Sequence, residues 1–246
     1  MIFINRITII TGHYGSGKTE FAVNFTLNAA KTDREAYEKL AICDLDLVNP
    51  YFRSREHREL FEANGIEVHG STYRGEITAE IPALGASVRG PLENAQYRTV
   101  LDVGGNDSGA LVLRQYGKYF RQADGDAENS APNCNVIAVV NFCRYETRSV
   151  EDALTQVRMI EDATGLHVDY IVNNTHLLRE TTAETVLRGH ALALELCGKL
   201  EAGTERKVEL LCDCYPMNIV SLNDISDTCA NPFPLELYLR PTYLDM

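Results

Sequence analysis

Residues 12–19 of this 246-residue chain read Gly12-His13-Tyr14-Gly15-Ser16-Gly17-Lys18-Thr19, and this stretch decides the fold. It follows the isoleucine-rich run Phe3–Thr11, which predicts a buried strand, and it opens the run Lys18–Lys31, whose apolar spacing predicts a helix. Glycines let backbone N–H groups turn inward around phosphate groups, since side chains there would block them. The following helix adds the positive end of its dipole. We therefore expect residues 12–19, called the phosphate loop below, to bind a nucleoside triphosphate.

The last two residues of the phosphate loop carry the chemistry expected of such a site. The Lys18 ammonium reaches the β- and γ-phosphates, and the Thr19 hydroxyl ligates Mg²⁺. We expect the whole loop and the next residue, Glu20, to line the nucleotide. The alternative is a chance glycine-rich turn, but the position between a strand and a helix is the context that the motif requires.

Apolar runs alternate with helical patterns along the rest of the chain. Further strands are predicted at Leu40–Asp44, Ile66–His69, Arg98–Val103, Val136–Asn141, Val168–Asn173 and Lys207–Cys212, and further helices at Tyr51–Asn64, Val150–Thr164 and Thr182–Leu200. This alternation predicts a doubly wound α/β fold, a mostly parallel sheet with helices on both faces. The polar segment Ala123–Asn135 indicates a surface loop rather than a linker, so residues 1–246 form one predicted domain.

Aspartates follow two of the predicted strands. Strand Leu40–Cys43 leads into Asp44-Leu45-Asp46, and strand Arg98–Leu101 leads into Asp102-Val103-Gly104-Gly105. The carboxyl ends of parallel strands are where ligands of such sheets bind. One aspartate can hold Mg²⁺ through water, another can orient an attacking water, and Gly105 can offer its N–H to the γ-phosphate. For any single aspartate the alternative is a helix N-cap or a turn.

Together, the phosphate loop, Asp44-Leu45-Asp46 and Asp102-Val103-Gly104-Gly105 resemble the MinD/ParA-type branch of the SIMIBI P-loop nucleotidases. The resemblance spans roughly Phe3 to Asn218. It implies an ATPase in which Lys18, Asp44 and Asp46 are catalytic, and in which Thr19, Asp44 and Asp102 hold the metal. Asp46 would position water and Asp44 would join the Mg²⁺ shell or the first switch, although the division between these two stays open.

The chain departs from that family at His13. Members carry a signature lysine there, which commonly reaches the nucleotide of the partner subunit in a dimer. Arg53 or Arg55, just after Asn49-Pro50, can supply the missing charge, and the alternative for both is a solvated surface. The resemblance to this family, taken alone, still predicts a homodimer.

The segment after the strand Val168–Asn173 bears on the base. A guanine site of the usual kind needs Asn-Lys-x-Asp, whereas this chain has Asn173-Asn174-Thr175-His176. By the resemblance, Asn173 contacts adenine and the segment from Asp213 to Met217, with Pro216, closes over the base. We therefore expect ATP rather than GTP, with an ordinary turn as the alternative for Asn173.

Composition limits the partners and the compartment. Lysine plus arginine total 23 and aspartate plus glutamate total 35, a net charge of −12 that argues against nucleic acid. No apolar run is long enough to span a bilayer and no signal peptide is recognisable, so we expect a cytoplasmic protein with free thiols at its seven cysteines. The pair Cys212 and Cys214 cannot complete a tetrahedral metal site alone, and His176 and His190 have no ligand-like neighbours in sequence.

The sequence thus favours a slow, Mg²⁺-dependent ATPase that switches loops around Asp46 and Gly105 and so acts on a protein partner. Two alternatives stay open. One is a small-molecule kinase or ligase of related fold, and the other is a nucleotide-binding regulator that does not hydrolyse.

Overall fold

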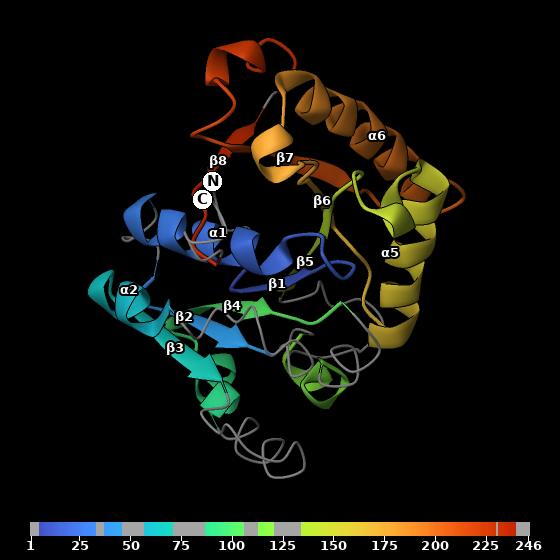
Figure 1. Cartoon of the computed structure of the whole chain (residues 1–246). Coiled ribbons are helices and arrows are strands. Elements are labelled where there is room, and N and C mark those ends of the chain that lie inside the picture. The colour runs from blue at the N-terminus through green and yellow to red at the C-terminus, as the bar shows by residue number, and fades with distance from the viewer. Residues whose placement is uncertain are drawn as a thin grey trace.

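The computed structural model describes residues 5–32, 37–45, 57–70, 87–105, 113–120, 134–229 and 231–239. Eight strands of this part of the chain form one sheet in the order β3-β2-β4-β1-β5-β6-β7-β8, and every pair is parallel (Figure 1). The strands are β1 (Ile7–Thr11), β2 (Lys39–Asp44), β3 (Ile66–Gly70), β4 (Tyr97–Asp102), β5 (Cys134–Val140), β6 (Tyr170–Asn173), β7 (Glu209–Pro216) and β8 (Pro232–Leu235).

Helices cover both faces of this sheet. The α-helices are α1 (Lys18–Thr32), α2 (Arg58–Ala63), α5 (Val150–Thr164) and α6 (Ala183–Glu201), with residues 87–93 also helical, and 3₁₀ turns lie at Gly117–Tyr119, Tyr145–Thr147, Leu178–Glu180 and Leu222–Asp224. Successive strand residues face opposite sides. Ile10 packs with α1 and α2, whereas its neighbour Ile9 packs with α5 and α6 on the other face. The doubly wound α/β fold is confirmed.

Local signals set the ends of the two long helices on the second face. Ser149 caps α5 by accepting a hydrogen bond from the Asp152 N–H, and Gly165 ends it in the left-handed conformation. Thr182 caps α6 in the same way, with the Thr185 N–H as donor. The predicted bounds of α5 are confirmed, and α6 differs from its prediction by one residue at each end.

Strand β8 was not predicted, because its sequence contains Pro232 and Pro234. A proline cannot donate a ladder hydrogen bond, so it is tolerated only at the edge of a sheet. Here β8 is the outermost strand beside β7, and Phe233 packs on Phe21 of α1 with ring centroids 5.5 Å apart. The same pairing extends β7 to Pro216, beyond the predicted end at Cys212.

Some predictions fall on residues outside the described part of the chain. These are Asp46, Arg53, Arg55 and the first half of the predicted helix Tyr51–Asn64, of which α2 is the described remainder. The predicted surface loop Ala123–Asn135 is wrong at its end, since Cys134 and Asn135 are buried in β5. Within the described ranges no helix combines the length and the apolar character needed to span a membrane.

Candidate functional site

Three glycines shape the phosphate loop between β1 and α1. Gly12, Gly15 and Gly17 have φ values of 155°, 74° and 82°. A Cβ on Gly17 would lie 2.3 Å from the Asn174 amide nitrogen, and one on Gly12 would lie 2.4 Å from the Val139 oxygen. Both the backbone conformation and the close approach of the strands β5 and β6 therefore require glycine here.

Side chains from two neighbouring strand ends hold the outer side of the phosphate loop. The Asn174 amide, just after β6, donates to the Ser16 oxygen over 2.8 Å. The Arg144 Nε, after β5, donates to the Gly15 oxygen over 2.9 Å. Within the loop, the Ser16 N–H donates to the His13 oxygen over 3.0 Å. These bonds fix the loop in its curved conformation without any ligand.

Thr19 and two aspartates gather at the carboxyl ends of β1, β2 and β4. The Thr19 hydroxyl donates to Asp102 over 3.4 Å. Asp44 pairs with Asp102 in the register of β2 and β4, and both carboxylates are buried. Hydroxyl and carboxylate oxygens are the ligands that Mg²⁺ prefers. The three residues predicted to hold the metal therefore come from adjacent elements at one edge of the sheet.

Two buried oxygens at the phosphate loop suit a polar ligand. The Ser16 hydroxyl and the Asn174 side-chain oxygen are buried, and neither has a hydrogen-bond partner among the described residues. Buried polar atoms almost always form a hydrogen bond, and a buried donor or acceptor left without a partner costs about 1–3 kcal/mol. A phosphate oxygen can accept from the Ser16 hydroxyl, so the loop fits the group that its sequence predicts.

Gly105 lies directly against the phosphate loop. A Cβ on this residue would be only 1.7 Å from the main-chain oxygen of Gly12. No side chain can occupy that space, because the neighbour is backbone. The segment after β4, predicted to meet the γ-phosphate through Gly105, is therefore in contact with the start of the loop.

The side chain of Asn173, predicted to contact adenine, is bonded within the protein. Its side chain is fully buried, and its amide donates to Asp213 over 2.8 Å and to the Val186 oxygen over 3.1 Å. Its oxygen accepts from the Thr175 N–H over 3.2 Å. Both polar atoms of this side chain are thus engaged in hydrogen bonds within the protein. The next residue, Asn174, is the one whose side chain contacts the loop. Adjacent residues of a strand face opposite sides, and the sequence does not show which of the two faces the loop, so sequence reasoning missed Asn174.

Glu20 also differs from its expected place. Its carboxylate accepts hydrogen bonds from the N–H groups of Tyr238 and Leu239, over 2.7 and 3.2 Å. Burial raises the pKa of Glu20 to about 7, although these two bonds act to lower it. The side chain therefore joins α1 to the segment after β8.

The charged groups beside the loop were only partly foreseen. His13, in the signature-lysine position, lies 3.8 Å from the Glu146 carboxylate. Burial, with a smaller effect of the Arg144 charge, lowers the pKa of His176 to about 4, so this histidine is neutral near pH 7. Arg144, in contrast to His176, is a cation that is hydrogen-bonded to the loop itself, at the Gly15 oxygen. Sequence analysis missed it, since nothing in its local sequence marks it.

The predicted base segment forms the end of β7. Pro216 is buried there and its oxygen accepts from the Ile219 and Val220 N–H groups. Met217 and Ile219, next along the chain, are exposed. Tyr14, at the outer side of the loop, is 68% exposed. Tyr14, Met217 and Ile219 are thus exposed apolar side chains, whereas Asn173 is fully buried.

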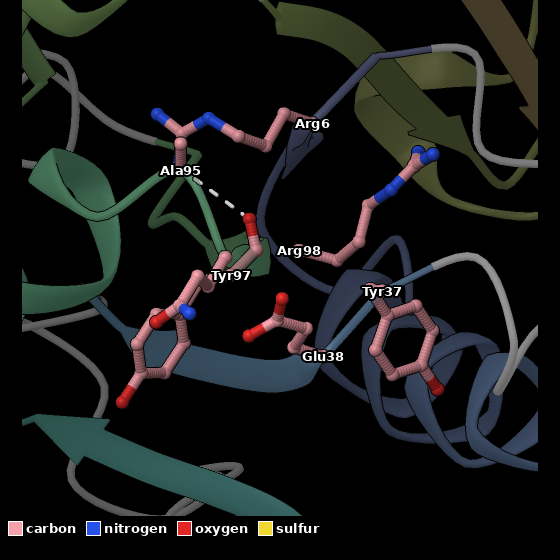
Figure 2. A pocket seen from close by; sticks show the side chains of 7 residues that line it. Arg6, Tyr37, Glu38, Ala95, Tyr97 and Arg98 are labelled. Atoms are coloured by element: carbon pink, nitrogen blue, oxygen red, sulfur yellow. Dashed lines mark hydrogen bonds between the residues drawn. The ribbon is translucent and has the colours of Figure 1, made fainter.

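A separate pocket of about 310 Å³ lies at the amino ends of the strands, away from the carboxyl ends that carry the phosphate loop (Figure 2). Its lining includes Arg6 and Glu38, which immediately precede β1 and β2, and Arg98 near the start of β4. The Arg6 guanidinium donates to four main-chain oxygens there, and Arg98 donates to the Asn5 oxygen. These cations hold the amino ends of the strands together, so we assign this pocket a structural role.

No protein-family model matches the sequence, and no curated protein matches it either. Solved structures with a similar course of the chain include a nucleotide-binding protein from Archaeoglobus fulgidus in complex with ADP, at 16% identity over 84% of this chain and 81% of that one, with a TM-score of 0.43. Cell division protein FtsY from Thermotoga maritima matches at 16% identity over 83% and 60%, with a TM-score of 0.49. The signal recognition particle 54 kDa protein from Aeropyrum pernix, in complex with GDP, matches at 16% identity over 83% and 41%, with a TM-score of 0.43. This chain thus spans less than two thirds of the length of the last two.

Proposed function

We propose that this protein is a Mg²⁺-dependent nucleoside triphosphatase, with ATP as its substrate. The observation that carries the proposal is the Thr19–Asp102 hydrogen bond at the phosphate loop, with Asp44 beside it in register. A threonine hydroxyl and a nearby carboxylate are the parts that hold the metal of a P-loop site. The buried Ser16 hydroxyl and the backbone contact of Gly105 with Gly12 support the same site.

Each group has a distinct task in this proposal. Lys18 would bind the β- and γ-phosphates, and Thr19, Asp44 and Asp102 would hold Mg²⁺. The metal, when bound, neutralises charge on the phosphate oxygens. Asp46 or Asp44 would orient the attacking water, and the Gly105 N–H would bind the γ-phosphate. Positioning and charge stabilisation supply most of the catalysis in phosphoryl transfer.

Arg144 is the candidate for the charge that the signature lysine would otherwise supply. ATP brings about four negative charges, of which Mg²⁺ and Lys18 offset about three. His176 is neutral near pH 7, and His13 faces Glu146. Arg144 carries a guanidinium and is already bonded to the Gly15 oxygen. We propose that its guanidinium stabilises the triphosphate from within the same subunit, which makes turnover less dependent on a dimer.

The preference for ATP rests on the absence of a guanine-reading carboxylate after β6. In the segment from Asn174 to His176 there is no acidic residue. Asp213, the acidic group nearest in the sheet, is buried and bonded to Asn173 and His190. Because the Asn173 amide is bonded to Asp213 and to the Val186 oxygen, we propose that the base packs beside the end of β7 at Pro216 and Met217.

Calorimetric titration of ATP, with Mg²⁺ and with a chelator, tests the binding site. We expect Mg²⁺ to strengthen binding and ADP to form without an added metabolite. ADP that forms only with a metabolite would support the kinase or ligase instead, and tight binding without turnover would support a regulator. Failure to bind any nucleotide would overturn the proposal.

A second experiment addresses the proposed protein partner and the switch. Asp46→Asn should slow hydrolysis and hold the ATP form, if Asp46 positions the water. We expect a partner to be captured by this variant with ATP and released with ADP. Equal capture in both nucleotide states would contradict a switch.

A further inference from the structure

Three metal-binding side chains from separate parts of the chain meet beside β7. They are His190 of α6, Asp213 of β7 and Cys229, which follows the turn Leu222–Asp224. One nitrogen, one oxygen and one sulfur, one from each, all lie within 4.8 Å of one another. His190 has no ligand-like neighbours in sequence, and the fold brings Asp213 and Cys229 to it from distant parts of the chain.

The fold holds these groups in place. Gly189 lets α6 approach β6, since a Cβ there would lie 2.4 Å from side-chain atoms of Asn173 and Thr175. This brings the His190 Nδ1 to 2.8 Å from one oxygen of Asp213. The other Asp213 oxygen accepts from the Asn173 amide over 2.8 Å. Such a partner fixes the orientation of a ligating carboxylate.

The surroundings are those of a closed metal site. The side chains of Asp213 and His190 are 2% and 13% exposed, and Cys229 is buried. Val186, Tyr215, Val220 and Ile225 form an apolar cluster with Cys229. A histidine at the rim leaves an entry path, while the apolar side chains limit water.

We propose that His190, Asp213 and Cys229 bind a transition-metal ion of the Zn²⁺ type. A set of nitrogen, oxygen and sulfur ligands suits Zn²⁺ in a tetrahedral site, with water in the fourth position. Mg²⁺ is excluded by its preference for oxygen. Two ionised ligands, the carboxylate and the thiolate, balance the charge of a divalent ion. This site is distinct from the proposed nucleotide site and does not depend on it.

Metal binding must displace the thiol proton. Cys229 ligates a metal ion as the thiolate and not as the thiol. Binding releases that proton, and its affinity increases with pH. The ion would join α6, β7 and the segment before β8, and so would stabilise the fold.

The other cysteines provide internal controls. Cys212 and Cys214 lie in the cluster on the opposite face of the sheet, with Phe21 and Phe233. Cys143 is partly exposed and its sulfur accepts a bond from Arg188 over 3.5 Å. Cys143, Cys212 and Cys214 therefore lie outside the proposed site.

Titration of the full, untagged, chelator-treated chain with Co²⁺, without nucleotide, tests this site. We expect one equivalent to bind, with a thiolate-to-cobalt charge-transfer absorption that Zn²⁺ abolishes by competition. Cys229→Ser should remove this absorption and weaken Zn²⁺ binding by more than the roughly 100-fold typical of losing an outer partner. Cys143→Ser should keep both.

His190→Gln tests the site independently of any thiol. It should weaken Zn²⁺ binding while circular dichroism shows a folded chain. A folded wild-type protein without the charge-transfer absorption would overturn the proposal, as would an absorption that survives in Cys229→Ser. In either case the three residues would form only a buried hydrogen-bonded network.

Discussion

The Asn174 side-chain amide donates a hydrogen bond to the main-chain oxygen of Ser16 over 2.8 Å, joining residues 158 positions apart. This bond ties the end of β6 to the phosphate loop. Its close approach also explains why Gly17 carries no side chain, because a Cβ would lie 2.3 Å from the same nitrogen. Asn174 is therefore a positioning residue for the loop, and the predictions below concern the groups that the loop positions.

Lys18→Ala should weaken ATP binding by about 10- to 150-fold, since a hydrogen bond to a charged group contributes about 1.5–3 kcal/mol. The fold should survive if Lys18 serves mainly the ligand. Calorimetric titration measures the affinity, and circular dichroism checks the fold. Lys39→Ala is the matched control, because Lys39 pairs with Glu67 at the start of β2. Unchanged affinity in Lys18→Ala would exclude the proposed nucleotide site.

Gly105→Ala should abolish or greatly weaken ATP binding, because the methyl group would meet the Gly12 oxygen and displace the loop. Gly90→Ala is the control, as nothing lies within 4 Å of a Cβ at that position. Both variants should be titrated with ATP and unfolded in urea. Normal ATP affinity in Gly105→Ala would show that this contact is not needed for the site.

ATP should bind more tightly than GTP, because residues 174–176, directly after Asn173, contain no carboxylate that could accept from guanine. Competition of both nucleotides against a fluorescent analogue gives the ratio. Met217→Ala should weaken both nucleotides if the base packs beside Pro216. A clear preference for GTP would refute the adenine assignment.

Arg144→Ala should lower turnover more than His13→Ala, because Arg144 is the cation bonded to the loop. ATPase assays and light scattering on both, and on Arg53→Ala and Arg55→Ala, separate catalysis from assembly. Arg148→Ala is the local control, since its guanidinium lies 4.8 Å from the Tyr145 ring. Loss of both dimer and turnover in His13→Ala alone, with the arginine changes silent, would show that His13 performs the task of the lysine.

Glu20 and His176 should impose opposite pH dependences on stability. The pKa of Glu20 rises from 4.5 to about 7 on folding, so its contribution is full below pH 4.5 and is lost as pH rises toward 7. The pKa of His176 falls from 6.5 to about 4, so its contribution is full above pH 6.5 and is lost as pH falls toward 4. The two effects partly cancel between pH 4.5 and 6.5.

Glu20→Gln should therefore make the free energy of unfolding increase more steeply between pH 4.5 and 6.5, by about 2 kcal/mol relative to the wild type. Urea denaturation at the two pH values, without nucleotide, measures this. Glu184→Gln, at an exposed position in the first turn of α6, should behave as the wild type. An unchanged slope in Glu20→Gln would mean that the Glu20 carboxyl is not held in the buried form described above.

Much of the fold follows from local sequence. The phosphate loop was recognisable because glycine spacing and the flanking strand and helix are all within about 30 residues. The bounds of α5 were predicted correctly, and the residues that cap it, Ser149 and Gly165, act within one turn. Asp44 and Asp102 were placed together correctly, since each follows a parallel strand and such strands end at the same edge.

Contacts between distant segments depended on the tertiary structure. Arg144, Asn174 and the group of His190, Asp213 and Cys229 have no local motif, because their partners lie on other strands and helices. Asn173 was assigned to the base by the family resemblance, but sequence does not show which residue at a strand end faces the loop, and its neighbour Asn174 contacts it. The sequence by itself determined the phosphate loop, the alternation of strands and helices, and the carboxyl ends of the strands as the place of the site. Which polar side chains meet there was decided by packing, since burial forces each polar group to find a partner across the fold.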